Sequence, residues 1–212
     1  VAFYRSFVKG QVMACSTREA EAVKLLENMY RDVNIAFANE LSIVMDNYGL
    51  DAHQVIGLAN LHPRVNILQP GVGVGGYCLQ DNPWFLINDF PESWPLATAA
   101  RQVNTLKPAW VIEKVMAYAN AHMLKRIACF GATYKANVAD TRKSPALEII
   151  QELRQTYELR VVDPYVRDTM CAEEAILWAD LIVGLVPHEA FQHTTSFNYK
   201  EKHQLDFAGV FV

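Results

Sequence analysis

A run of helix-forming residues between Ser16 and Gly49, uninterrupted by glycine or proline, constrains this chain more than any other feature. Ser16 and Glu19 have the spacing of a capping box, in which each side chain satisfies the other residue's backbone N–H at a helix start. Apolar residues then recur at helical intervals. The pattern predicts one helix of about 30 residues, roughly 45 Å long. A second helix, capped by Asp51, is predicted to end near Asn60.

Glycine and proline punctuate the next segment, residues 62–77, which is predicted to be a loop. Pro83 is placed in the first turn of a short helix that runs through Asn88, because proline loses no hydrogen bond at that position. A further helical pattern extends from Leu96 to His122. Pro108 is expected to bend or break this helix.

The period of the pattern changes after residue 123, where short apolar runs alternate with helical segments. Strand–helix–strand order predicts a parallel sheet with right-handed crossovers. The predicted strands are 126–131, 159–163 and 181–185, and the predicted helices are 144–157 and 173–178. We therefore expect an α/β chain with an all-α central domain over residues 1–123 and a Rossmann-like domain over residues 124–212.

Composition limits the class of protein. Of the 212 residues, 51% are hydrophobic and 20% are charged, which is typical of a folded chain with a buried core. The net charge of −4 and the lack of a basic run argue against nucleic acid as a partner. No apolar stretch reaches the roughly 18 residues that a membrane-spanning helix requires, so no membrane partner is expected.

The four cysteines form no CxxC pair and no cluster with histidine at zinc spacing. They are expected to be reduced thiols of a cytoplasmic protein without a metal site. The sequence opens without an initiator methionine or a signal-peptide core. This start predicts that the chain is a fragment of a longer protein.

Cys78 follows Gly75 and Gly76 in the glycine-rich loop. Glycines let the backbone approach a ligand closely and present a thiol from a turn. Such a cysteine can act as a covalent nucleophile. An ordinary half-buried thiol explains the same residues, and on this local feature alone it is the stronger explanation.

Lys24, Asn28 and Arg31 are spaced by four and three residues, so they share one face of the long helix. A lysine and an amide on one stripe could hold an anion, a water molecule or a developing oxyanion. A solvated helix face would carry the same residues. The apolar character of the rest of the helix favours partial burial of its polar side chains.

The loop after the first predicted strand, residues 131–145, carries Lys135 and Arg142 and ends at the helix cap Ser144. In open α/β sheets, ligands bind beyond the carboxyl ends of the strands. Two cations beside a helix N-terminus favour phosphate. The loop lacks the GxGxxG dinucleotide pattern, and a basic surface loop explains its residues equally well.

Together and in this order, these segments resemble the UDP-glucose/GDP-mannose dehydrogenases, which are nucleotide-sugar 6-dehydrogenases. The resemblance runs over nearly the whole chain. Within the family it is greatest to the UDP-N-acetylmannosamine branch, on the evidence of residues 32–41, 62–71 and 83–85. The segments that carry the family resemblance are 19–28, 31–41, 75–78, 140–146, 161–164 and 179–183.

The resemblance implies an NAD-dependent enzyme that oxidises the C6 alcohol of a UDP-N-acetylhexosamine, with UDP-N-acetylmannosamine favoured, to the uronic acid. Cys78 would trap the aldehyde as a thiohemiacetal and then carry a thioester that water hydrolyses. Lys24 and Asn28 match the pair that stabilises the oxyanion and holds water. UDP-glucose, UDP-N-acetylgalactosamine and UDP-N-acetylglucosamine stay open as substrates, since the sugars differ at C2 and C4.

The resemblance also implies binding positions. In the family, loop 68–77 wraps the sugar nucleotide and the residues after the first C-terminal strand contact the UDP portion. Arg142 matches an arginine that reaches NAD. Arg64 matches one that enters the neighbouring subunit's site, which implies a homodimer through the long central helix. The substrate-binding positions are expected at Arg64, Leu68, Gly75, Tyr77, Tyr134 and Lys135.

Two departures from the family pattern affect these expectations. The family usually has aspartate four residues after the cysteine, where this chain has Asn82 with Asp81 before it. Either Asp81 takes over through a shifted turn, or thioester hydrolysis is slow, or the enzyme is impaired. The family's NAD-binding N-terminal domain, with its GxGxxG segment, is absent, so this chain alone is not expected to catalyse the reaction.

Two other functional classes stay open. A non-catalytic, dimerising UDP-sugar-binding fragment or degenerate homologue would keep the same binding residues, and Asn82 favours it. A thiol-dependent hydrolase would need a base beside Cys78. His53 and His62 are the nearest histidines in sequence, and no pattern supports either.

Overall fold

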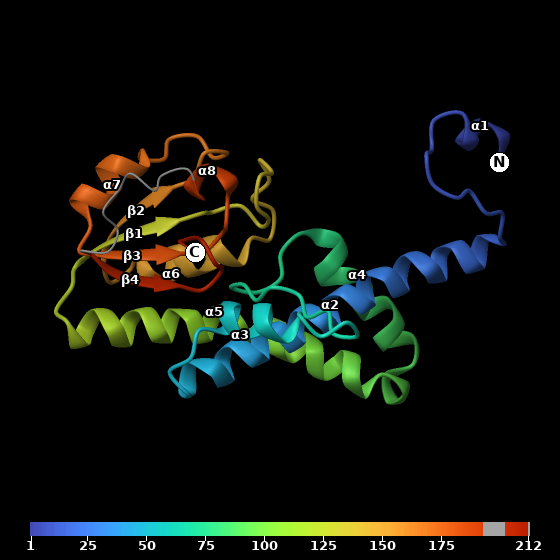
Figure 1. The fold of residues 1–212 in the computed structure, drawn as a ribbon, viewed down its shortest axis with the longest axis horizontal. Coiled ribbons are helices and arrows are strands. Elements are labelled where there is room, and N and C mark those ends of the chain that lie inside the picture. The colour runs from blue at the N-terminus through green and yellow to red at the C-terminus, as the bar shows by residue number, and fades with distance from the viewer. Residues whose placement is uncertain (193–201, 212) are drawn as a thin grey trace.

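The computed structural model describes residues 1–192 and 202–211, which form a helical part followed by an α/β part (Figure 1). The helical part contains α1 (Ala2–Arg5), α2 (Thr17–Asn47), α3 (Ala52–Ala59), α4 (Tyr77–Asp89), a 3-10 turn (Pro91–Ser93) and α5 (Pro95–Ala121). The α/β part contains β1 (Arg126–Phe130), α6 (Pro145–Leu153), β2 (Glu158–Val162), α7 (Ala172–Trp178), β3 (Leu181–Gly184), α8 (Glu189–Gln192) and β4 (His203–Asp206). The predicted fold class, a helical domain with a long helix followed by a parallel-sheet α/β domain, is confirmed.

The long helix α2 has the predicted start and end. The Glu19 N–H donates to Ser16 Oγ at 3.3 Å, and the Ser16 N–H donates to Glu19 Oε2 at 2.8 Å, which completes the capping box. Gly49 follows the helix with a φ of +68°, a conformation that glycine adopts without strain. The helix between these ends is 31 residues long. Both ends are therefore encoded locally.

A buried polar network joins α2 to α5. Arg101 contacts Asp32 Oδ1 at 2.6 Å, and the Asn104 amide donates to the same oxygen at 2.8 Å. Asn39 donates to Asn104 Oδ1 at 2.9 Å and accepts from the Gly71 N–H, also at 2.9 Å. The network fixes the two long helices against each other. It also anchors the loop that leads from α3 to α4.

Two prolines lie in the interior of helices. Pro83 lies in the interior of α4, which begins at Tyr77, so the prediction that Pro83 starts a short helix is wrong. Pro108 does not break α5, which runs without interruption. Both prolines are buried. The backbone at Gly73 packs against the Pro108 ring closely enough that a Cβ there would lie 3.2 Å from Pro108 Cγ. Tertiary packing therefore offsets the hydrogen bond that each proline removes.

The sheet has the strand order β2-β1-β3-β4, and all of its pairings are parallel. One face is covered by α6 and the C-terminal half of α5, and α7 lies on the other (Figure 1). The first three strands match the sequence prediction within a residue or two, whereas β4 was not predicted. All four strands end at one edge of the sheet, which faces the helical part (Figure 1). Ligands of parallel sheets bind at this edge.

Candidate functional site

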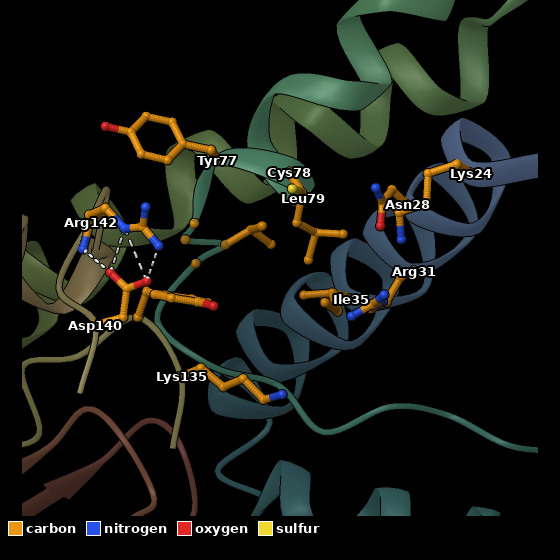
Figure 2. A pocket seen from close by; sticks show the side chains of 15 residues that line it. Lys24, Asn28, Arg31, Ile35, Tyr77, Cys78, Leu79, Lys135, Asp140 and Arg142 are labelled. Carbon is orange, nitrogen blue, oxygen red and sulfur yellow. Dashed lines mark hydrogen bonds and ion pairs between the residues drawn. The ribbon is translucent and has the colours of Figure 1, made fainter. Parts of the chain in front are cut away.

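A cavity of about 500 Å³ lies between α2, the first turn of α4 and the loop that follows β1 (Figure 2). Both parts of the chain contribute to it, since the loop after β1 leaves the carboxyl edge of the sheet. The lining residues are Lys24, Asn28, Arg31 and Ile35 from α2, residues 73–79, and Tyr134, Lys135, Asp140 and Arg142. The structure thus brings together Lys24, Asn28, Gly75, Tyr77, Cys78, Tyr134, Lys135 and Arg142 of the predicted site residues.

Cys78 is the second residue of α4 and its side chain is exposed at the cavity (Figure 2). The helix begins after Gly76, whose φ of +77° allows the loop to turn sharply into it. This position leaves the Cys78 thiol accessible to a ligand in the cavity. Cys129 contrasts with it, because complete burial raises the pKa of that thiol to about 12 and keeps it protonated.

Asn28 faces Cys78 across the cavity from α2 (Figure 2). It is only 2% exposed, and its Nδ2 has no hydrogen-bond partner within residues 1–192 and 202–211. Leaving a buried amide donor unpaired costs about 1–3 kcal/mol, so a site of this kind favours a ligand oxygen or a water that accepts from it. Lys24 and Arg31 lie on the same face of α2 and are exposed, which makes this wall of the cavity a row of donors.

The glycine loop and the loop after β1 approach each other closely. A Cβ at Gly75 would lie 2.5 Å from Tyr134 Cβ and 2.8 Å from the Lys143 carbonyl oxygen. The Gly76 N–H donates to the Arg142 carbonyl at 3.3 Å. Only a residue without a side chain fits at Gly75, so this contact explains why glycine precedes the cysteine and fixes one wall of the cavity.

Arg142 is held by its neighbour Asp140 in a two-pronged contact. Arg142 Nε lies 2.9 Å from Asp140 Oδ1, and Arg142 Nη2 lies 2.6 Å from Asp140 Oδ2. The hydrogen bonds from the Arg142 side chain and backbone lower the pKa of Asp140 to about 2. The Arg142 guanidinium also lies 5.5 Å from the centre of the Tyr77 ring. These contacts orient a charged guanidinium at the rim of the cavity.

Four predicted site residues, Arg64, Leu68, Asp81 and Asn82, do not line the cavity. Arg64 is exposed in the turn after α3, and Leu68 is half-buried in the following loop. Asp81 contacts Lys143 Nζ through both carboxylate oxygens, at 2.7 and 2.8 Å. Because α4 is continuous through these positions, no shifted turn brings Asp81 to the place of Asn82, which lies one turn after the cysteine.

Two charged lining residues, Arg31 and Asp140, are not among the predicted site residues, although the sequence placed Arg31 on the helix face of Lys24 and Asn28. The signal for Asp140 was its place two residues before Arg142. Within the described residues, no three His, Cys, Asp or Glu side chains lie close enough together to hold a metal ion. Among the described helices, none combines the length and apolarity needed to cross a bilayer.

The fold and the cavity together define a class of protein in which a helical domain and the loop at the edge of a parallel sheet enclose a cavity with an exposed thiol. Two family models match the chain. The central domain of the UDP-glucose/GDP-mannose dehydrogenase family matches residues 18–106, and the UDP binding domain of that family matches residues 128–211. The chain belongs to this family.

Individual relatives of the chain are also nucleotide-sugar dehydrogenases. The chain is 42% identical to an NDP-N-acetyl-D-galactosaminuronic acid dehydrogenase of Ralstonia nicotianae, over 98% of this chain and 52% of that protein. It is 41% identical to the UDP-N-acetyl-D-mannosamine dehydrogenase of Escherichia coli K12, over 98% of this chain and 54% of that protein.

Solved structures resemble the whole chain. A UDP-D-ManNAc dehydrogenase from Pyrococcus horikoshii superposes with a TM-score of 0.88 at 36% identity, over 100% of this chain and 53% of that one. A UDP-N-acetyl-mannosamine dehydrogenase from Staphylococcus aureus superposes with a TM-score of 0.84 at 37% identity, over 99% of this chain and 52% of that one. The chain therefore spans about half the length of the relatives it matches.

Proposed function

We propose that this chain is the thiol-bearing and UDP-binding part of an NAD-dependent UDP-sugar 6-dehydrogenase. The substrate is a UDP-N-acetylhexosamine, with UDP-N-acetylmannosamine favoured because several similar proteins carry that name. One observation carries the proposal: the exposed thiol of Cys78 lies opposite the buried, unpaired amide of Asn28 in a cavity that also holds Lys135 and Arg142. A nucleophile, an oxyanion donor and phosphate-binding cations are thereby combined in one site.

In this proposal Cys78 attacks the C6 aldehyde, and a bond forms between its sulfur and C6 while the carbonyl oxygen becomes an oxyanion. Asn28 and Lys24 donate to that oxygen, which relieves the unpaired Asn28 amide. NAD, when bound, accepts a hydride in each of the two oxidations. The resulting thioester is cleaved by water, which releases the acid and restores the thiol.

The nucleotide lies against Tyr134 and Lys135, on the wall that the loop after β1 forms. Lys135 is exposed there and supplies positive charge for a diphosphate. Arg142, oriented by Asp140, is the residue of this chain that fits an NAD phosphate. The G-x-G-x-x-G run of this chain, residues 71–76, lies between α3 and α4 and does not follow a strand. It therefore does not form a dinucleotide-binding turn, and most contacts to NAD come from other parts of the protein.

The test is turnover by the full-length protein that contains this chain. With NAD and UDP-N-acetylmannosamine, we expect two NADH and one acid per sugar, and a higher kcat/KM than with UDP-glucose, UDP-N-acetylgalactosamine or UDP-N-acetylglucosamine. NADH formation from none of the four sugars would contradict the proposal. If calorimetry shows that UDP binds but no NADH forms, the result would instead support a non-catalytic UDP-sugar-binding protein. Asn82, in the place of the family's usual aspartate, favours that alternative.

We predict that Asn82→Asp speeds hydrolysis of the acyl-enzyme. An amide cannot act as a base, whereas a carboxylate one turn after Cys78 can accept a proton from the attacking water. General base catalysis typically contributes about 10²–10⁴-fold, so an increase of about tenfold or more is expected in single-turnover experiments. Asp81→Asn, which breaks the contact to Lys143, is the matched control and should leave this rate unchanged. Identical single-turnover rates for Asn82→Asp and the unaltered protein would remove Asn82 from the mechanism.

We also propose a homodimer through α2, in which Arg64 enters the partner's site. Arg64 is exposed and lies outside the cavity of its own chain. Large apolar side chains are exposed along the helix, and burying them favours association. They are Val23, Leu26, Tyr30, Phe37 and Val44.

The dimer predicts that Phe37→Glu yields a monomer, because a charge replaces an apolar side chain in the interface. Light scattering at micromolar concentration measures the mass. Leu177→Glu on α7 is the control, since Leu177 is 80% exposed and lies far from α2 along the chain, in the α/β part. A monomeric unaltered protein, or a dimer that survives Phe37→Glu, would count against this interface.

A further inference from the structure

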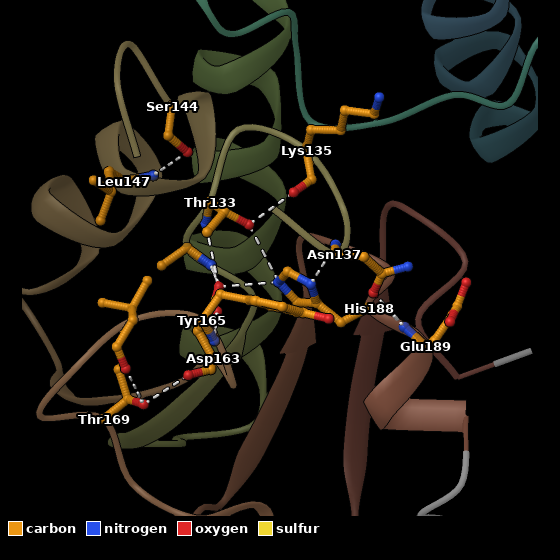
Figure 3. A network of polar contacts seen from close by, with 12 residues as sticks. Thr133, Lys135, Asn137, Ser144, Leu147, Asp163, Tyr165, Thr169, His188 and Glu189 are labelled. Carbon is orange, nitrogen blue, oxygen red and sulfur yellow. Dashed lines mark hydrogen bonds and ion pairs between the residues drawn. The ribbon is translucent and has the colours of Figure 1, made fainter. Parts of the chain in front are cut away.

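The loop that presents Tyr134 and Lys135 rests on a buried histidine–aspartate pair that belongs to neither wall of the cavity (Figure 3). His188 is completely buried and Asp163 is 2% exposed. Asp163 Oδ2 lies 3.0 Å from His188 Nε2. The same oxygen accepts from the Ala132 N–H at 2.7 Å. The aspartate therefore holds both the histidine ring and the start of the loop.

The hydrogen bonds define the protonation of the pair. The Asn137 N–H donates to His188 Nδ1 at 3.0 Å, so this nitrogen carries no proton and acts as the acceptor. The proton of the neutral ring is therefore on Nε2, which donates to Asp163. Burial raises the pKa of Asp163, but hydrogen bonds from His188, Ala132 and Tyr165 together lower it below its usual value. Asp163 is thus an ionised acceptor.

His188 holds the far end of the same loop. Asn137 has a φ of +60°, and besides its N–H contact to His188 its side-chain oxygen accepts from the Glu189 N–H at 3.0 Å. Between the two ends, Thr133 Oγ1 donates to the Lys135 carbonyl at 3.0 Å and lies 3.2 Å from His188 Nε2. The backbone around Lys135 is therefore held at both ends and in the middle (Figure 3).

We propose that His188 is a positioning residue that holds the loop 132–137 in the conformation required for binding the nucleotide. The inference rests on the proposed function, in which Tyr134 and Lys135 contact UDP. His188 does not line the cavity, so it acts through these two residues rather than on the ligand. A loop that is ordered before binding loses less conformational entropy when the ligand arrives. His188 thereby sets the affinity for UDP and not the rate of the chemical step.

Two substitutions separate the contacts of the histidine. Glutamine places its amide nitrogen near the position of Nε2 and keeps the contact to Asp163, whereas asparagine places its amide oxygen near Nδ1 and keeps the acceptor for Asn137. We expect His188→Gln to weaken UDP binding about tenfold, which corresponds to about 1.4 kcal/mol. His188→Asn should change the dissociation constant by less than about threefold. Titration calorimetry with UDP on the full-length protein measures both.

Turnover distinguishes positioning from a general loss of structure. His188→Gln should raise the KM for the UDP-sugar with kcat within about twofold, as expected when binding and not the chemical step is affected. His203→Gln on β4 is the matched control, because His203 contacts Tyr118 and no residue of this loop. A lower melting temperature for His188→Gln with unchanged UDP affinity and KM would overturn the proposal.

Hydrogen exchange tests the positioning without any ligand. In the unliganded protein, His188→Gln should accelerate exchange of the Asn137 amide, whereas His188→Asn should leave it protected. Unchanged exchange in His188→Gln, or equal acceleration in both variants, would overturn the role of His188 in the loop. Failure of the unaltered protein to bind UDP, with the exchange pattern as expected, would reject the proposed function alone.

Discussion

Cys78→Ser in the full-length protein is expected to abolish formation of the uronic acid. Serine keeps the size of the side chain but replaces a sulfur nucleophile, which adds readily to an aldehyde and leaves readily from an acyl group, with a hydroxyl. We expect the rate of acid formation to fall by about a thousandfold or more, in the range that follows loss of a nucleophile. Product analysis after incubation with NAD and the UDP-sugar measures this rate.

Two controls support the interpretation of Cys78→Ser. UDP affinity should be unchanged, because Tyr134 and Lys135, which lie on the loop after β1, are unaltered. Cys171→Ser should retain full activity, since Cys171 is an exposed thiol outside the cavity, at the start of α7. Normal acid formation by Cys78→Ser would refute the covalent mechanism.

Arg101→Met is expected to cause the largest loss of stability. The change leaves Asp32, which is completely buried, with a carboxylate bonded by Asn104 alone. Removing one partner of a buried ion pair costs about 3–5 kcal/mol. For a chain of this size, each kcal/mol lowers the melting temperature by about 2–4 °C, so a decrease of roughly 6–20 °C is expected. Thermal unfolding followed by circular dichroism measures it.

Two comparison variants separate burial from charge. Burial raises the pKa of Asp32, and contacts from Arg101 and Asn104 offset this only in part, so desolvation dominates at this pair. Asp32→Leu combined with Arg101→Met should therefore recover part of the lost stability. Arg126→Met breaks an exposed ion pair with Asp180 and should cost no more than about 1 kcal/mol. An Arg101→Met variant as stable as Arg126→Met would show that the buried pair contributes nothing.

Local signals predicted those elements whose ends are decided by neighbouring residues. The capping box at Ser16 and Gly49 define α2, and Ser144 caps α6 as expected, with its Oγ 3.4 Å from the Leu147 nitrogen. The buried strands β1 and β3 were recognised because apolar side chains follow one another without a break, as strands buried on both faces require. The resemblance then placed the thiol and its surroundings on specific residues.

The misplaced elements depend on contacts between distant residues. Pro83 and Pro108 are helix breakers by local rules, yet each lies inside a helix because packing there is favourable. Strand β4 was not predicted, because its residues are half-exposed and only its pairing with β3 defines it as a strand. Asp81 forms an ion pair with Lys143, which lies 62 positions away, and no local pattern predicts that contact.

The sequence by itself determined the class of fold and the order of most elements, because these follow from capping and periodicity. The site residues were predicted from the family resemblance. Only the tertiary structure decided which side chains meet. It placed Asn28 opposite Cys78 with its amide unpaired, and joined His188 to Asp163 behind the loop that carries Lys135. These contacts link residues at least 25 positions apart. A local sequence pattern cannot predict them, because the residues meet only when the helices and strands pack together.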